Sequence, residues 1–290
     1  MTMTAIEFFR VTEETIDLLA EQHNVKDLEK YYQLTDFKIF KELNEMDGIE
    51  QTFMQIAFHG QNATMISNIV KFKDNYKKIK KILCGFNPKK TKDEFVGESR
   101  DEEVTKLLEA FQENGITWNA NKSKKRPNAI MVRYANLLLD AAEYLGNFNA
   151  KQEVVDDLMR NYENQDVKHL VSYFRSKIKS GFSVALTCDF LKEFTTEFSN
   201  LPKPDIHIKD TLCVLKGLNE NYYHTEKREY ECIKHVQDLV AEINLVLKGE
   251  NKKEITVYQL DRMIWLICSN KFFLDDSTSN SKEMYLSKIV

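Results

Sequence analysis

The residues whose types and spacing best suit chemistry lie between positions 167 and 216. Asp205 follows the proline-containing segment Leu201–Pro204 and precedes an apolar helical run, so we expect its carboxylate at the N-cap of a helix. A carboxylate held at a fixed position can stabilise a developing positive charge, and it can orient or deprotonate an attacking water. His207 adds an imidazole at the same helix start. This segment is therefore a candidate carboxylate centre.

A second kind of chemistry is indicated by the short connection that precedes this segment, Lys179-Ser180-Gly181-Phe182-Ser183. Its small residues let the backbone approach a ligand closely, so successive N–H groups can face a phosphate. A turn of this composition also occurs in many helical hairpins that bind nothing, and by itself it indicates only the hairpin.

The elements that must position these residues are helices. Apolar residues recur at helical spacing over 167–178 and 184–194, which predicts a helix–hairpin–helix over 167–194. Similar periodicity runs through most of the chain, and a capped helix start is expected at Thr12. The chain has only nine glycines and four prolines. Because a sandwich or barrel needs a turn about every 8–12 residues, we predict an all-α fold.

The order of these features resembles the DNA glycosylase superfamily that includes endonuclease III and the 8-oxoguanine glycosylases. Members carry a Gly-x-Gly hairpin and then an Asp-x-His-hydrophobic motif that opens a helix. Gly181 and the run Asp205–Ile208 follow that order here. Upstream, the string His59–Asn62 matches the polar helix end with which these proteins fill the gap left by a flipped base. The run 259–268 is a looser match to the closing helix of related proteins.

This resemblance implies an enzyme of base-excision repair that flips a damaged or modified base out of duplex DNA and hydrolyses its N-glycosidic bond. Asp205 would be the catalytic carboxylate, facing the oxocarbenium character that develops at the sugar carbon. Gln61, together with Asn62, would fill the gap in the duplex. Further DNA contacts are implied for Lys179, Ser180, Gly181, Ser183, Lys203 and His207, and Tyr222 and Tyr223 are weaker candidates for the base pocket.

The second hairpin glycine of the family is replaced here by Ser183 or Lys179, and two further departures bear on the chemistry. Lyase members carry a Schiff-base lysine just after the hairpin, but the matching position here falls on Ser183 or Ala185. The five cysteines are scattered and form no Cys-x-x-Cys pair, so the four-cysteine iron–sulfur motif is absent. We therefore predict a monofunctional glycosylase without AP-lyase activity, which requires no cofactor. The ion that the family would place at the hairpin is a monovalent cation, Na⁺ or K⁺.

The net charge of −4 conceals a polarised distribution of charge. Residues 71–92 contain nine lysines against the single acid Asp74, and residues 120–133 form a second basic tract. Solvated lysines on exposed helix faces explain the first tract equally well. Two separate tracts favour a surface that contacts phosphates. Together with this surface, the resemblance implies double-stranded DNA with a lesion or a modified base as the partner of a monomeric protein.

The resemblance further predicts two helical lobes with a DNA-binding cleft. Residues 1–50 and 150–290 would form one lobe and residues 51–149 the other. No window approaches the ~18 uninterrupted apolar residues of a membrane span, and the first residues contain no apolar signal core. These features predict a cytoplasmic protein with no membrane partner, and the DNA partner that the resemblance implies makes it nucleoid-associated. Residues 1–45 and 93–125 lie outside the resemblance.

An alternative hypothesis is a non-catalytic DNA-binding protein that keeps the hairpin scaffold and uses Asp205 only as a helix cap. The two hypotheses differ in the expected surroundings of Asp205. In a glycosylase its carboxylate faces a cleft, whereas in a scaffold protein it is closed off against its own helix. The residues leave the excised base open between an alkylated purine, 8-oxoguanine and a mismatched or phage-type modified base.

Overall fold

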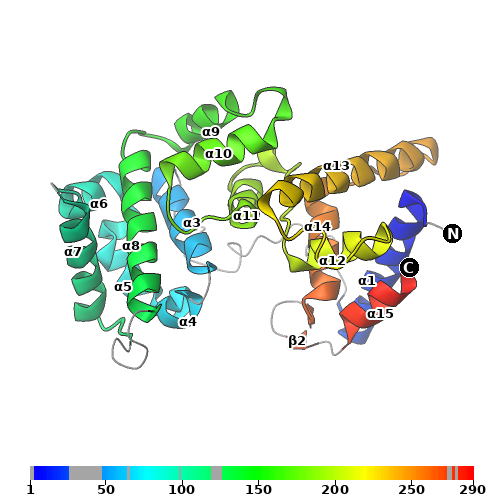
Figure 1. Ribbon diagram of the computed structural model, residues 1–290, viewed down its shortest axis with the longest axis horizontal. Coiled ribbons are helices and arrows are strands. Elements are labelled where there is room, and N and C mark those ends of the chain that lie inside the picture. The colour runs from blue at the N-terminus through cyan, green and yellow to red at the C-terminus, as the bar shows by residue number, and fades with distance from the viewer. Residues whose placement is uncertain are drawn as a thin grey trace. The chain divides into compact units, whose positions relative to one another are not determined.

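The structure, a computed structural model, describes residues 3–25, 48–63, 66–97, 99–118, 126–272, 276–277 and 280–290. The prediction of an all-α fold is confirmed (Figure 1). A short antiparallel ladder joins β1 (Lys271–Phe272) to β2 (Asp276–Ser277). None of the described helices combines the length and apolar character that crossing a membrane requires.

The chain divides into two compact units. Met1–Asp36 and Leu191–Val290 make up the chain-end unit, and Phe37–Phe190 make up the central unit. The sequence placed residues 150–190 with the chain ends, whereas the structure groups them with the central segment. The predicted hairpin therefore belongs to the central unit.

The central unit is organised around α8 (Arg126–Leu145), which packs against α3 (Ile49–Gln61), α6 (Pro88–Phe95) and α7 (Arg100–Glu113) (Figure 1). Along α8 an apolar stripe is fully buried, and the buried Tyr134 hydroxyl donates to Ala57 O at 2.9 Å. The remaining elements are α4 (Ile66–Val70), α5 (Phe72–Ile82), η3 (Cys84–Phe86), α9 (Lys151–Arg160), η4 (Glu163–Gln165), α10 (Val167–Lys177) and α11 (Val184–Phe194), whose last residues enter the chain-end unit.

In the chain-end unit, α14 (Val257–Cys268) packs against α1 (Ala5–Gln22) and α12 (Ile206–Leu215). Two further helices, α13 (Glu226–Gly249) and α15 (Ser281–Lys288), complete its surroundings, and η5 (Thr196–Phe198) precedes the segment that leads to α12. Side chains close the starts of α13 and α14, where Thr225 and Thr256 accept first-turn N–H groups.

The predicted helix start at Thr12 is wrong. α1 begins at Ala5, where Thr4 and Glu7 form a reciprocal capping box. Thr12 lies in the middle of α1 and is fully buried, with its hydroxyl 2.8 Å from both Phe8 O and the Tyr285 hydroxyl. The error arose because a threonine followed by acids suits a cap, although the apolar stripe extends further towards the N-terminus.

Two glycines allow a close approach of backbone to α8. A Cβ on Gly60, in α3, would lie 2.5 Å from Leu137 Cδ1, and a Cβ on Gly181, in the hairpin, would lie 2.4 Å from the same atom. Gly181 also has φ +87°, in the left-handed region. Both glycines therefore make room for the Leu137 side chain within the central unit.

We predict that Gly60→Ala destabilises the protein by about 1–3 kcal/mol, because the added methyl group overpacks against Leu137. Gly249 provides the control: it ends α13 with no atom within 4 Å of an added Cβ, so Gly249→Ala should be neutral or stabilising by up to about 1 kcal/mol. Urea unfolding of both variants measures the difference.

Leu137, the residue that the added methyl group would meet, gives a second control. In a Leu137→Ala background the space for the Gly60→Ala methyl group exists, so the penalty should shrink or disappear in a double-mutant cycle. A Gly60→Ala penalty that is the same in both backgrounds would contradict the packing explanation.

Candidate functional site

Asp205 is the N-cap of α12, as the sequence predicted. Its Oδ1 accepts the N–H groups of His207, at 2.9 Å, and Ile208, at 3.2 Å. The side chain is half-buried, and both described hydrogen bonds end on the same oxygen. The carboxylate is thus held in one orientation by the start of α12, where the helix dipole favours negative charge.

His207 lies beside this carboxylate with a half-buried ring. Its Nδ1 is buried and has no hydrogen-bond partner within the described residues. Burial lowers the pKa of His207; the charge of Asp205 opposes the shift, and the nearby Lys282 adds to it. The ring is therefore neutral near pH 7, so it would meet a phosphate as a hydrogen-bonding group.

The hairpin between α10 and α11 is tied down by a buried carboxylate of α8. Asp140 Oδ2 accepts the N–H of Lys179 at 3.0 Å, and the N–H of Ser180 interacts with the same carboxylate. Arg100 donates to the other oxygen. These contacts engage the first amides of the hairpin, so the amides that remain as candidates for a phosphate begin at Gly181.

The end of the hairpin starts the second helix. Ser183 Oγ accepts the N–H of Leu186 at 3.2 Å, and Ser183 O accepts both the N–H and the hydroxyl of Thr187. Ser183 is thus a helix cap, and a phosphate contact from its hydroxyl would compete with the cap.

A cation at the hairpin would need oxygen ligands, as hard cations do. Within the described residues, no hydrogen bond ends on a carbonyl oxygen of residues 179–182, so these oxygens fit that requirement. No three His, Cys, Asp or Glu side chains cluster closely enough in the described parts of the chain to hold a metal ion.

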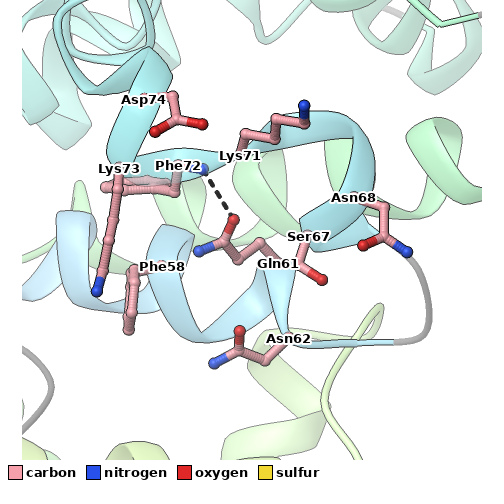
Figure 2. A pocket seen from close by; sticks show the side chains of 9 residues that line it. All are labelled: Phe58, Gln61, Asn62, Ser67, Asn68, Lys71, Phe72, Lys73 and Asp74. Carbon is pink, nitrogen blue, oxygen red and sulfur yellow. Dashed lines mark hydrogen bonds between the residues drawn. The ribbon is translucent and has the colours of Figure 1, made fainter. Parts of the chain in front are cut away.

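The polar string at the end of α3 borders a pocket of about 470 Å³ (Figure 2). Gln61 is only 6% exposed, and its Oε1 accepts the N–H of Phe72 at 3.0 Å, so it secures the start of α5. Asn62 is exposed. For Gln61 to enter a duplex this bond to Phe72 must break, whereas Asn62 is already at the surface.

Donor groups dominate the lining of this pocket. Lys71, Lys73 and Asn68 border it, and Asp74 is the acid among them (Figure 2). The full lining is Phe58, Gln61, Asn62, Ser67, Asn68, Lys71, Phe72, Lys73 and Asp74. Ammonium and amide groups beside a helix start suit a phosphate-bearing ligand.

The lysines of α5 share one exposed face. The buried side of the helix consists of Phe72, Tyr76, Ile79 and Ile82, and the exposed side carries Lys73, Lys77, Lys78, Lys80 and Lys81. The second basic tract begins outside the described residues at 119–125, and the side chains of residues 126–128 are likewise not described.

The two candidate pocket tyrosines lie in the turn that precedes α13. Tyr223 is fully buried, with its hydroxyl 2.7 Å from Nδ1 of His235, so its ring has no free face for a base. Tyr222 is half-buried, and the Arg228 guanidinium lies 4.1 Å from the centre of its ring. Of the two tyrosines, Tyr222 alone is partly exposed, and the Arg228 guanidinium already occupies one face of its ring.

Two carboxylates that sequence reasoning missed hold the candidate residues in place. Asp140 anchors the hairpin, and Asp261 accepts the N–H of Lys203 at 2.7 Å, just before Asp205. An acid inside the apolar stripe of a predicted helix was the available signal in both cases.

Comparison with protein-family models, with curated proteins and with solved structures finds no match to this chain.

We predict that Asp205→Asn lowers the pKa of His207 still further, because the charge of Asp205 raises it in the native protein. Titration of the imidazole Cε1–H resonance by NMR measures the shift. His235 is the internal control: burial also lowers its pKa, and Asp205 is not among the groups that act on it. An unchanged or higher pKa of His207 in the variant would contradict the arrangement.

The same shift predicts a pH dependence of stability. The pKa of His207 is lower in the folded than in the unfolded chain, so the unfolded state binds the proton more tightly. The contribution of His207 to stability is therefore complete at neutral pH and declines as the pH falls below about 6.5.

Proposed function

We propose that the protein is a monofunctional DNA glycosylase that removes a damaged or modified base flipped out of duplex DNA, with Asp205 as its catalytic carboxylate. The observation that carries this proposal is the fixed orientation of Asp205, whose Oδ1 is held by two backbone N–H groups of α12. A charge held in place before the reaction stabilises the transition state without reorganisation.

In the proposed reaction the bond between C1′ of the deoxyribose and the base nitrogen breaks, and its electron pair leaves with the base. The carboxylate of Asp205 stabilises the positive charge at C1′. A water molecule then adds to C1′, its proton passes to Asp205, and the departing base takes up a proton from solvent. The products are the free base and an intact strand with an abasic site.

In this proposal the central unit supplies the contacts that hold the DNA. The amides from Gly181 onward would contact a phosphate, and Asn62, at the edge of the pocket, would enter the gap left by the base. The exposed lysine face of α5 would supply further phosphate contacts. Flipping costs a few kcal/mol of stacking, which such contacts offset.

Two of the lysines that flank Asp205 in the sequence are held in ion pairs. Lys192 is 7% exposed in its side chain and pairs with Asp261 at 2.7 Å. Lys209 pairs with Glu229 at 2.6 Å. A Schiff base requires a free, accessible amine, which neither side chain supplies.

A second candidate function is DNA binding without catalysis. The observation that favours it is again the cap: Asp205 fulfils a structural requirement of α12, which is sufficient reason for an aspartate at this position. Excision activity separates the two candidates.

We predict that the wild-type protein releases a base from at least one duplex in a panel of lesions and modified bases, and that Asp205→Asn lowers the rate on the order of 10²-fold or more. Asparagine caps a helix as well as aspartate does, so the fold and the Kd for DNA should be retained. Alkali treatment of labelled duplexes reveals abasic sites, and borohydride should trap no covalent adduct.

The matched control is Asp166→Asn, since Asp166 caps α10 by accepting the N–H of His169 at 2.9 Å. This variant should retain full excision. Activity that survives Asp205→Asn would refute the role of Asp205, and tight DNA binding by an inactive wild type would favour the non-catalytic candidate.

We further predict that Lys77→Gln/Lys81→Gln weakens DNA binding and makes the slope of log K against log[salt] less negative, by about 0.9 for each phosphate that the variant no longer neutralises. Both residues are exposed and lie one turn apart on α5. The control is Lys227→Gln/Lys248→Gln, which removes two exposed charges from α13. Binding titrations at several salt concentrations measure the slopes, and equal slopes for the two double variants would contradict a role for this face.

A further inference from the structure

A single buried carboxylate oxygen joins the end of α11 to the segment that leads to Asp205. Asp261, in α14, is 3% exposed in its side chain, and its Oδ2 accepts both the Lys192 ammonium and the N–H of Lys203 at 2.7 Å. Lys192 is itself buried, and its ammonium also lies 5.6 Å from the centre of the Tyr258 ring.

The connection from Asp261 to Asp205 continues through the backbone of one residue, Lys203. Lys203 donates its N–H to Asp261, and Lys203 O accepts the N–H of Asp205 at 2.7 Å. Pro204 stands between the two residues, where its ring fixes φ. The backbone of Asp205 is therefore linked to Asp261 by two successive hydrogen bonds.

The rest of the segment is held by the neighbouring helices. Tyr258 N–H, at the start of α14, donates to Ser199 O at 3.1 Å. The Gln237 amide, in α13, donates to Asn200 O at 2.8 Å. The segment thus has no regular structure of its own, yet three of its backbone groups are bonded to α13 and α14.

A buried ion pair is a poor means of adding stability, because desolvation of both charges offsets their attraction. A buried ion pair instead fixes the positions of its two side chains, because moving one of them away would leave the other charge in the core without its counter-ion. Burial raises the pKa of Asp261 and the Lys192 ammonium opposes the shift. The pair accordingly fixes where the carboxylate lies, and with it the peptide of Lys203.

We propose that Asp261, paired with Lys192, is the positioning residue for the Asp205 carboxylate. This inference rests on the proposed function. Asp261 is buried and acts through the Lys203 peptide, so it contributes to the rate of base excision and leaves DNA affinity unchanged. Misplacement of a reacting group by about 1 Å lowers a rate on the order of 10²-fold.

The test compares two double variants that both lack the buried charges. In Lys192→Met/Asp261→Asn the asparagine oxygen still accepts the N–H of Lys203, whereas in Lys192→Met/Asp261→Leu no acceptor remains. The single change Asp261→Asn removes the carboxylate charge that lies 2.7 Å from the buried Lys192 ammonium and is expected to fold poorly. Removing both charges together keeps the comparison valid.

With enzyme in excess over DNA, the asparagine variant should keep a single-turnover excision rate within about tenfold of the wild type, and the leucine variant should lose on the order of 10²-fold. The Kd for DNA should be the same in both. Hydrogen exchange without DNA should show a protected Lys203 amide in the asparagine variant and an exposed one in the leucine variant.

The readouts separate the two levels of the proposal. Equal excision rates for the two double variants of an active enzyme, or equal exchange at Lys203, would overturn the positioning role and leave the proposed function standing. A wild type that excises no base from any duplex would refute the proposed function, whatever the exchange experiment shows.

Discussion

Backbone amides in irregular segments need partners when they are buried, and this constraint shapes both candidate regions of the protein. Each unit meets it with one buried carboxylate. Asp140 accepts an N–H of the hairpin in the central unit, and Asp261 accepts an N–H of the segment before α12 in the chain-end unit. Each carboxylate is neutralised by a cation, Arg100 or Lys192. In both units, therefore, a buried carboxylate holds the backbone of the segment that contains most of the candidate functional residues.

This arrangement changes the explanation of the hairpin. Small residues in a turn predict a backbone that a ligand can approach. Here other residues of the protein already occupy part of that space and bind two of the backbone N–H groups. Gly181 gives space to Leu137, and the amides of Lys179 and Ser180 face Asp140. A ligand on the hairpin would meet the amides that follow. The glycine makes room for Leu137 whether or not DNA binds, so packing by itself explains a glycine at this position.

The sequence was informative where local chemistry decides the outcome. Helical periodicity predicted the all-α fold, and the prolines before Asp205 predicted its place at the N-cap. It failed where a local pattern had two solutions, as at Thr12, which resembles a cap but is buried within α1. The roles of Asp140 and Asp261 could not be predicted, because each depends on a loop distant in sequence. The sequence likewise offered Gln61 as a side chain that could enter the duplex, and only the fold shows that its Oε1 accepts the N–H of Phe72.

The cap formed by Asp205 does not decide between catalysis and structure, because one carboxylate can serve both. An ionised carboxylate offers two oxygens with about four acceptor positions. The helix uses Oδ1 for two N–H groups, so the cap itself determines the direction in which the second oxygen points. A free aspartate would have to be ordered at the moment of reaction, whereas this one is ordered by folding. The neutral His207 beside it adds no competing positive charge near pH 7. The structural role is therefore the means by which a catalytic role would be prepared.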